Sequence, residues 1–188
     1  TDYIDLYQFH NPSMENLEKI TAPGGGIYAA VPGSSYESMD GTSMASPHAA
    51  GAMAIVQQAL KKSNPDMSAA DRKHMTDTLL MSTAHIIYGE DGVPVSPRKQ
   101  GAGLISIHDA VSTEAYLSVA GQTKPKLELK DDPDMTGKYT MTFTVHNTGD
   151  TTLYYDITPW VLTDGSAEYT NAEGKTYVTS SETAVVLD

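Results

Sequence analysis

The 188-residue chain is acidic: 12 lysines and arginines stand against 24 aspartates and glutamates, a formal net charge of −12. This balance argues against nucleic acid or an anionic membrane as a partner, since either would require a basic patch. The chain contains no cysteine, which excludes disulfides, thiolate catalysis and cysteine-ligated zinc. No apolar run has the length of a membrane span or a signal peptide, and the first residue is Thr1 rather than methionine. We therefore expect a piece of a longer protein, made of one domain and part of a second.

The first part of the chain predicts short strands separated by loops. A mixed apolar stretch at residues 3–9 favours a strand, and Asn11-Pro12-Ser13 favours a loop after it. Proline and three glycines at residues 23–26 indicate a loop in which backbone approaches backbone closely. Residues 27–31 then predict a short strand, and residues 32–36 predict a turn. Residues 36–40 lead from this turn towards Ser43.

A turn of small residues at 40–47 leads directly into an apolar helical pattern. Gly41 allows a tight turn, Pro47 is tolerated near a first helical turn, and residues 49–56 are apolar on most faces. We expect this helix to run to about residue 62, before the Asn64-Pro65 stop signal, and to be largely buried. Ser43 would lie at the rim of a pocket, where the positive end of the helix dipole favours anionic character beside its oxygen.

A second helix follows from a start at Ser68 and Asp71 that resembles a capping box. Two histidines, His74 and His85, lie in or beside this helix without a second histidine or a cysteine at i+3 or i+4. We expect them to be surface residues rather than metal ligands. The apolar face of the helix consists of Ala69, Met75, Leu79, Leu80 and Ala84.

Residues 95–105 predict a glycine-rich turn, and residues 106–115 predict a short final helix. The glycines would let this helix pack back against the sheet, with Arg98 and Lys99 facing solvent. We expect these residues to serve packing and to have no catalytic task.

From about Gly121 the pattern changes from helical spacing to alternation. Apolar and polar residues alternate at residues 127–130, 139–146 and 153–157, which is typical of half-buried strands. Turns at residues 131–134 and 147–150 separate them, so we predict an antiparallel sandwich. Asp131, Asp132 and Asp134 in the first turn could bind calcium, although acidic turns are usually only solvated.

The run Gly-Thr-Ser-Met-Ala-Ser-Pro-His at residues 41–48 resembles the nucleophile signature of the subtilisin-like serine proteases, the subtilases. The resemblance implies that Ser43 is the nucleophile and that His48 is a helix residue rather than the catalytic base. Helical geometry agrees, since helical neighbours recur at three and four residues rather than five. The alternative, a buried alanine-rich helix with a Ser or Thr cap, does not require Met, Pro and His in this order.

Two further runs support the same resemblance. Ala-Pro-Gly at residues 22–24 is similar to a subtilase landmark and keeps its spacing to Ser43. The Ser-Pro-Arg and Gln-Gly-Ala-Gly-Leu of residues 96–104 resemble the end of the catalytic domain in the cell-envelope branch, the lactocepin and C5a-peptidase-like proteinases.

The resemblance implies an α/β subtilisin-like catalytic domain, of which residues 1–120 are the helix-rich C-terminal portion. Residues 121–188 would follow as an all-β, incomplete fibronectin-III-like sandwich. Subtilases place their catalytic aspartate, histidine and oxyanion asparagine upstream of the serine, so Ser43 is the one catalytic residue expected in this chain.

The implied function is that of a serine endopeptidase, secreted or cell-wall-attached, that hydrolyses protein or peptide substrates. No cofactor is expected, apart from a structural calcium that the parent protein could hold. The chain alone is expected to be inactive, and its partner is the missing N-terminal part of the catalytic domain. Neither nucleic acid nor membrane insertion is expected. The alternative is a non-catalytic surface-binding protein on a degenerate subtilase scaffold. Residues 10–19, which diverge from the subtilase pattern, are the feature that favours it.

Overall fold

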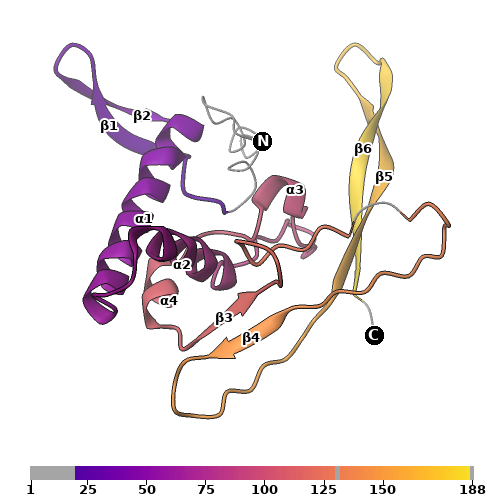
Figure 1. Ribbon diagram of the computed structural model, residues 1–188. Helices are drawn as coiled ribbons and strands as arrows, with labels where there is room; N and C mark the ends of the chain where they lie inside the picture. Colours follow the sequence, from indigo (N-terminus) through magenta and orange to yellow (C-terminus); the bar gives the residue numbers. More distant parts are fainter. Residues whose placement is uncertain (1–19, 130–131, 187–188) are drawn as a thin grey trace.

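The computed structural model describes residues 20–129 and 132–186 of the chain. Within them the strands pair two by two, as antiparallel β1–β2, β3–β4 and β5–β6. Figure 1 shows the helices gathered in one body, from which the β1–β2 and β5–β6 hairpins project. The elements in chain order are β1 (Ile27–Val31), β2 (Ser35–Met39), α1 (Thr42–Ser63), α2 (Ala69–Ser82), α3 (Pro97–Gln100), α4 (Ile107–Ser112), β3 (Ala115–Ser118), β4 (Thr144–Asn147), β5 (Trp160–Thr170) and β6 (Thr176–Val186).

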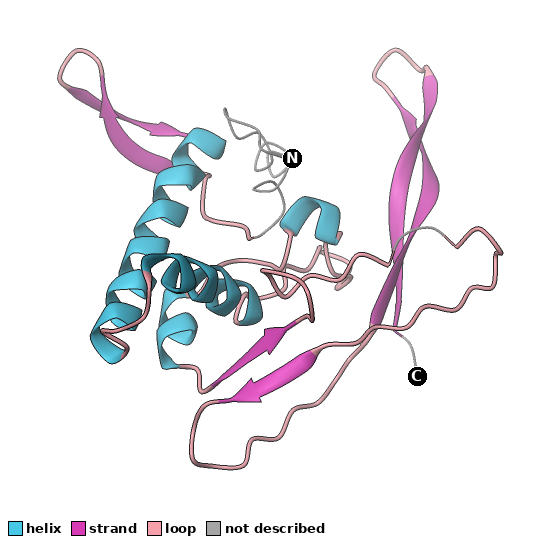
Figure 2. Ribbon diagram, viewed as in Figure 1, coloured by secondary structure: helices cyan, strands magenta, loops and turns pink. Residues whose placement is uncertain are grey.

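The hydrophobic core lies where α1, α2 and α4 meet, the group of helices drawn together in Figure 2. Its buried centre consists of Val56 on α1, Leu79 and Leu80 on α2, and Ala110 on α4. Partly buried apolar residues pack around this centre, namely Ile20, Met53, Leu60, Met75, Ile105 and Tyr116.

Helix α1 begins and ends close to where the sequence predicts. Gly41 precedes its first residue, and the backbone N–H of Asn64 donates to the carbonyl of Leu60 over 2.8 Å at its end. Lys61 and Lys62 lie in the last turn, where positive charge is favourable beside the negative end of the helix dipole. The predicted stop at residues 64–65 is therefore confirmed.

The burial of α1 is smaller than the sequence predicts. Its buried residues are Ala45, Ala52 and Val56. Ala50 and Ile55 are exposed, and 48% of Ile55 is accessible to solvent. The prediction of a largely buried helix is wrong for this chain, because α2 and α4 cover one side of α1 only.

Helix α2 has the start that its sequence predicts. Ser68 accepts the backbone N–H of Asp71 at 3.1 Å and donates its hydroxyl to the Asp71 carboxylate at 2.7 Å. This reciprocal capping satisfies a backbone donor that the first turn of a helix otherwise leaves unpaired. His74 and His85 are both exposed, as predicted.

The turn at residues 96–105 is held by a buried amide. The side chain of Gln100, 5% exposed, accepts the N–H of Ile87 at 2.7 Å and donates to the carbonyls of Ile87 and Val95. Gly103 has a φ of 124°, and a Cβ there would lie 2.3 Å from the His85 carbonyl oxygen, so only glycine allows this approach. Arg98 and Lys99 are both exposed, as predicted.

The last helix of this part is shorter than predicted. Helix α4 ends at Ser112, and Ala115–Ser118 forms β3 instead, which pairs with β4 so that Ala115 lies opposite Asn147. The backbone N–H of Leu117 also donates to the Ser82 hydroxyl at 3.0 Å, which attaches β3 to α2. A strand before residue 120 thus pairs with one after residue 121, and the domain boundary between these residues stays a prediction.

The alternating pattern of the C-terminal part forms fewer strands than predicted. Residues 127–129, 139–143 and 153–157 are not strands, and β4 contains only Thr144–Asn147. An alternating pattern specifies the two faces of a strand but does not supply a neighbouring strand with which to pair. Among the described residues, none of these segments pairs with another strand. The predicted strand at residues 3–9 lies outside the described residues, as does Asp131 of the predicted calcium turn.

We expect Leu80→Ala to destabilise the helical body by about 2–5 kcal/mol, because Leu80 is completely buried and its removal leaves a cavity. Urea unfolding followed by circular dichroism measures this change. The matched control is Ile55→Ala, at a half-exposed apolar position, which should cost less. Equal losses in the two variants would contradict the core described here.

Asp109 links α4 to the segment that follows α2. Its carboxylate lies 2.6 Å from His85 Nε2 and 3.2 Å from His108 Nδ1, and its backbone N–H donates to the Ser106 hydroxyl at 3.2 Å. Hydrogen bonds from Ser106, His108 and His85 hold the pKa of Asp109 well below its usual range. A carboxylate with a lowered pKa stabilises the folded state once the unfolded group is ionised.

We therefore expect Asp109→Asn to be less stable than the unchanged chain at pH 7. The difference should persist down to about pH 4, the ordinary pKa of aspartate, and shrink as the pH falls further towards the lowered pKa. Urea unfolding of both proteins between pH 7 and pH 3 measures it. A difference that grows on acidification would refute this account.

Candidate active site

Ser43 is the second residue of α1 and is exposed to solvent. Gly41 caps the helix with a φ of 139°, a backbone conformation that favours glycine, and it offers no side-chain acceptor. The first turn contains no acidic residue, so no side-chain charge there offsets the positive end of the helix dipole. The Ser43 hydroxyl therefore lies where negative charge on an oxygen would be stabilised.

The turn before Ser43 rests on the glycine loop at residues 22–26. The backbone N–H of Gly41 donates to the Gly24 carbonyl at 2.8 Å. A Cβ on Gly24 would lie 2.8 Å from the Gly41 carbonyl oxygen and 3.0 Å from Cβ of Ala45, which is buried. This is the close approach of backbone to backbone that the glycines predict, and it fixes the first turn of α1 against the loop.

Asp40 closes the base of the β1–β2 hairpin. Its carboxylate accepts the backbone N–H of Gly26 at 2.5 Å, so the residue before the turn is bound to the residue before β1. This role of Asp40 is not among those that the sequence predicts. The available signal was an aspartate directly before glycine, a pair in which the side chain often accepts a nearby backbone N–H.

His48 is turned away from Ser43, as predicted. Its Nδ1 lies 2.8 Å from the Met44 carbonyl oxygen, one helical turn back, and its ring is exposed. Pro47 has no N–H, so the carbonyl of Ser43 lacks the donor that a helix normally provides four residues later. In the described part of the chain, no hydrogen bond joins the Ser43 hydroxyl to a histidine or a carboxylate.

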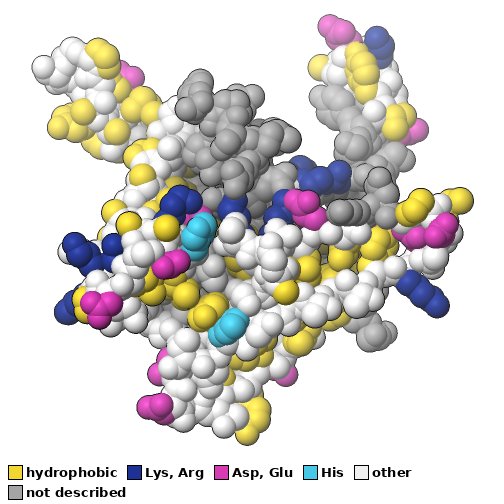
Figure 3. Space-filling view, viewed as in Figure 1, with side chains coloured by type: hydrophobic (Ala, Val, Ile, Leu, Met, Phe, Trp, Pro, Cys, Tyr) yellow, Lys and Arg dark blue, Asp and Glu magenta, His cyan; other side chains and the backbone are white. Residues whose placement is uncertain are grey.

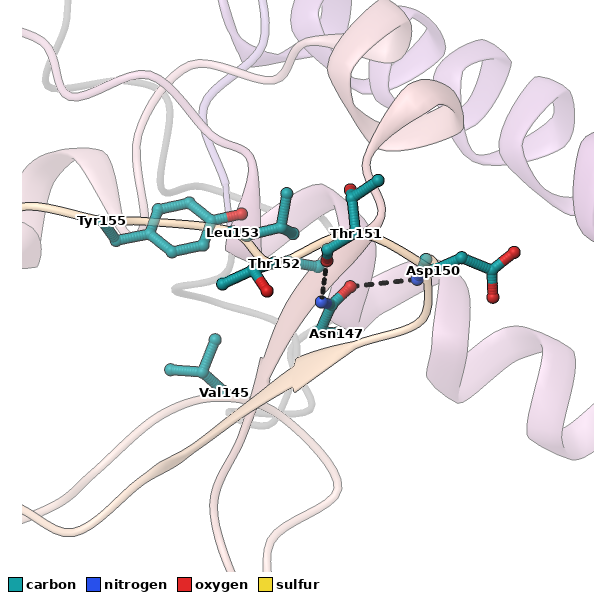
Figure 4. A pocket seen from close by; sticks show the side chains of 9 residues that line it. Val145, Asn147, Asp150, Thr151, Thr152, Leu153 and Tyr155 are labelled. Carbon is teal, nitrogen blue, oxygen red and sulfur yellow. Dashed lines mark hydrogen bonds between the residues drawn. The ribbon is translucent and has the colours of Figure 1, made fainter.

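A separate hollow of about 360 Å³ lies beside β4, in the C-terminal part. Figure 4 shows Asn147 at its edge, where the side chain donates to the Thr151 carbonyl at 2.6 Å and accepts the Gly149 N–H at 3.0 Å. Both polar groups of the Asn147 amide are therefore used within the turn that follows β4. The hollow contains none of the residues near Ser43, and is lined by Ala115, Val145, Asn147, Gly149, Asp150, Thr151, Thr152, Leu153 and Tyr155.

Gly24→Ala should displace the turn that carries Ser43, since the new methyl group would meet the Gly41 backbone at 2.8 Å. Gly25→Ala is the matched control, because its Cβ would lie 3.7 Å from the Asp40 carboxylate, an ordinary contact. We expect a loss of about 1–3 kcal/mol in the free energy of unfolding for Gly24→Ala and a much smaller loss for Gly25→Ala. Equal stability of the two variants, measured by urea unfolding, would show that the loop does not support the turn.

Comparison with known proteins places these residues in a family. A sequence model of the Subtilase family matches residues 7–103. The chain is 36% identical to the C5a peptidase of Streptococcus pyogenes over 142 residues, which is 74% of this chain and 12% of that protein. It is 39% identical to the PII-type proteinase of Lacticaseibacillus paracasei over 167 residues, which is 81% of this chain and 8% of that protein.

Among solved structures, the prenylagaramide maturation protease PagA superposes with a TM-score of 0.40 and 24% identity, covering 50% of this chain and 33% of that one. The chain spans only about an eighth or less of the curated relatives described above. The predicted resemblance to subtilases and to the C5a-peptidase-like proteinases is confirmed, whereas the role of Ser43 stays a prediction. By this match over more than half of its residues, the chain belongs to the subtilase family.

Proposed function

We propose that this chain is the nucleophile-bearing part of a serine endopeptidase, and that Ser43 attacks the peptide carbonyl of a protein substrate. The observation that carries the proposal is the position of Ser43, exposed at the start of a 22-residue helix and preceded by a glycine turn fixed on Gly24. The positive helix end would favour the negative charge that develops on the substrate oxygen during attack. Membership of the subtilase family supports this role.

Attack by a serine requires a base that accepts its proton and a carboxylate that orients the base. His48 is hydrogen-bonded to the Met44 carbonyl, so it is not such a base. In this proposal, the base, its aspartate and the oxyanion asparagine come from the N-terminal part of the catalytic domain. The chain alone is therefore inactive.

The exposed side of α1 supports a missing partner of this kind. Ala50, Ala54 and Ile55 form an apolar surface on a helix whose other side is already packed. A contiguous apolar surface on a helix is normally covered by further protein. The N-terminal part of the catalytic domain is the occupant that the proposed function requires.

Residues 121–188 belong, in this proposal, to a fibronectin-III-like domain. Alternate residues such as Tyr139, Met141 and Phe143 have between 43% and 58% of their surface exposed, which is unusual for large apolar side chains. Burying them would require strands that pair with these segments, as a complete sandwich would provide.

The substrates would be proteins or peptides outside the cell, and the whole protein would be secreted or attached to the cell wall. The similarity to a C5a peptidase and a PII-type proteinase supports this assignment. None of the helices in the described segments is long and apolar enough to cross a membrane. No cofactor is part of the proposed reaction, and the acidic charge of the chain opposes a nucleic-acid partner.

A fluorophosphonate probe tests the assignment, because it reacts with a serine only when a base activates the hydroxyl. We expect the complete protein to be labelled on Ser43, and Ser43→Ala to abolish both labelling and proteolysis without loss of folding. The matched control is Ser46→Ala, three residues along the same helix and also exposed, which should keep both. The 188-residue chain alone should stay unlabelled.

Two outcomes would overturn parts of the proposal. Stoichiometric labelling of the isolated chain would mean that a base lies within it, so the fragment would be active by itself. A complete, folded protein that is neither labelled nor proteolytic would favour a non-catalytic binding protein on a subtilase scaffold.

A further inference from the structure

The β1–β2 hairpin carries two stacked tyrosines that no part of the described chain covers. The ring centroids of Tyr28 and Tyr36 are 5.8 Å apart with an angle of 25° between the planes, and the residues are 72% and 61% exposed. Figure 3 shows this hairpin at the upper left, with hydrophobic side chains on its surface and no lysine or arginine there. Two large aromatic surfaces in water are costly, and such pairs are common at recognition sites.

The strand register explains why the tyrosines meet. Tyr28 lies opposite Ser38 and Tyr36 opposite Ala30, so these residues share one face of the hairpin. All of that face is exposed, whereas Ile27 and Met39 on the other face are partly buried. The tyrosine face is therefore the outer one, and stacking already restricts the rings before a ligand binds.

The hairpin is fixed relative to Ser43. Asp40 binds Gly26 across its base, and Gly41 binds Gly24 one residue further on. Tyr36 lies four residues before Asp40, which at about 3.3 Å per residue places its backbone about 13 Å from the start of the serine turn, and Tyr28, opposite Ser38, lies nearer. An extended peptide rises by about the same amount per residue, so a residue about four positions from its scissile bond would reach the pair.

Charge indicates which side chain the pair would accept. Between residues 20 and 60 the sequence has no lysine or arginine, while Glu37 lies on the opposite face of the same hairpin and Asp40 closes its base, so the hairpin carries only negative charge. Aromatic faces attract cations, most often arginine, and surrounding negative charge adds to this attraction. An acidic peptide would be repelled by the same groups.

We infer that Tyr28 and Tyr36 determine specificity by binding an arginine of the substrate about four residues from the scissile bond. This inference rests on the proposed function, because it requires the peptide to be held at Ser43. It adds a substrate class, basic peptides, and a pair of residues that select it without touching the reacting atoms.

The test uses the complete protein and peptides in which a single arginine, or its neutral isostere citrulline, is moved position by position away from a fixed scissile bond. We expect kcat/KM to be about 3- to 10-fold higher for arginine than for citrulline at a position about four residues away. Raising the salt concentration should reduce this ratio, because exposed charges are screened.

Four variants separate the tyrosine pair from general effects. Tyr28→Ala and Tyr36→Ala should bring the ratio close to one, whereas Tyr36→Phe should keep it because the ring remains. Tyr154→Ala, at a tyrosine 91% exposed in the C-terminal part, is the matched control and should also keep the ratio. Labelling of Ser43 by the fluorophosphonate probe should be equal in all variants.

The outcomes distinguish this inference from the proposed function. The inference is wrong, and the proposed function stands, if Ser43 is labelled and peptides are cleaved but kcat/KM is the same for arginine and citrulline. The same conclusion follows if both alanine variants still prefer arginine. A preference for an aromatic or acidic residue at that position would also refute it. If Ser43 is neither labelled nor required for cleavage, both fall together.

Discussion

The position of the candidate nucleophile depends on one backbone contact, the approach of Gly24 to the turn at Gly41. Their hydrogen bond of 2.8 Å holds the start of α1 against the loop before β1, and a single additional methyl group on Gly24 would meet the Gly41 backbone. Gly26 of the same loop donates its N–H to the Asp40 carboxylate and so closes the base of the β1–β2 hairpin. A serine hydroxyl is useful in catalysis only when its position is fixed to well within an ångström, so the glycines serve the site although they have no chemistry of their own.

The packing of the helical body is one-sided, and this one fact explains several features. The buried centre formed by Val56, Leu79, Leu80 and Ala110 attaches α1 to α2 and α4, but the opposite side of α1 presents apolar residues to water. The C-terminal part has the same character, since its large apolar residues are exposed along extended segments. Both surfaces have the apolar composition of a protein core, but no further layer of the described protein packs over them.

The sequence predicted those features that local chemistry determines. The capping of α2 by Ser68 depends on residues three positions apart, and the end of α1 depends on a few neighbours, so both could be predicted. The turn that carries Ser43, the candidate nucleophile, was predicted from a motif, and the loop before it from glycines that allow backbone to approach backbone closely. Sequence reasoning did not find the role of Asp40, whose partner Gly26 is 14 residues away. It also overestimated burial on α1 and misplaced the C-terminal strands, since two of the three predicted segments are not strands and β5 and β6 were not predicted. Both errors arise because burial and pairing depend on what lies opposite an apolar face and not on the face itself.

The pairing of β3 with β4 has a mechanical consequence. The start of β3 at Ala115 lies opposite the end of β4 at Asn147, and just beyond them Thr148 donates to the Glu114 carbonyl through its N–H at 2.7 Å and its hydroxyl at 3.0 Å. Once the edge contact between the Tyr88 and Trp160 rings had separated, tension between the helical body and the C-terminal hairpin would load these bonds and then open the ladder one residue pair after another. Bonds that break in succession resist less force than bonds sheared together. Separation of β3 from β4 would let residues 119–143 extend. The bond from Leu117 to Ser82 would still hold β3 on α2, so the turn that carries Ser43 would not be strained.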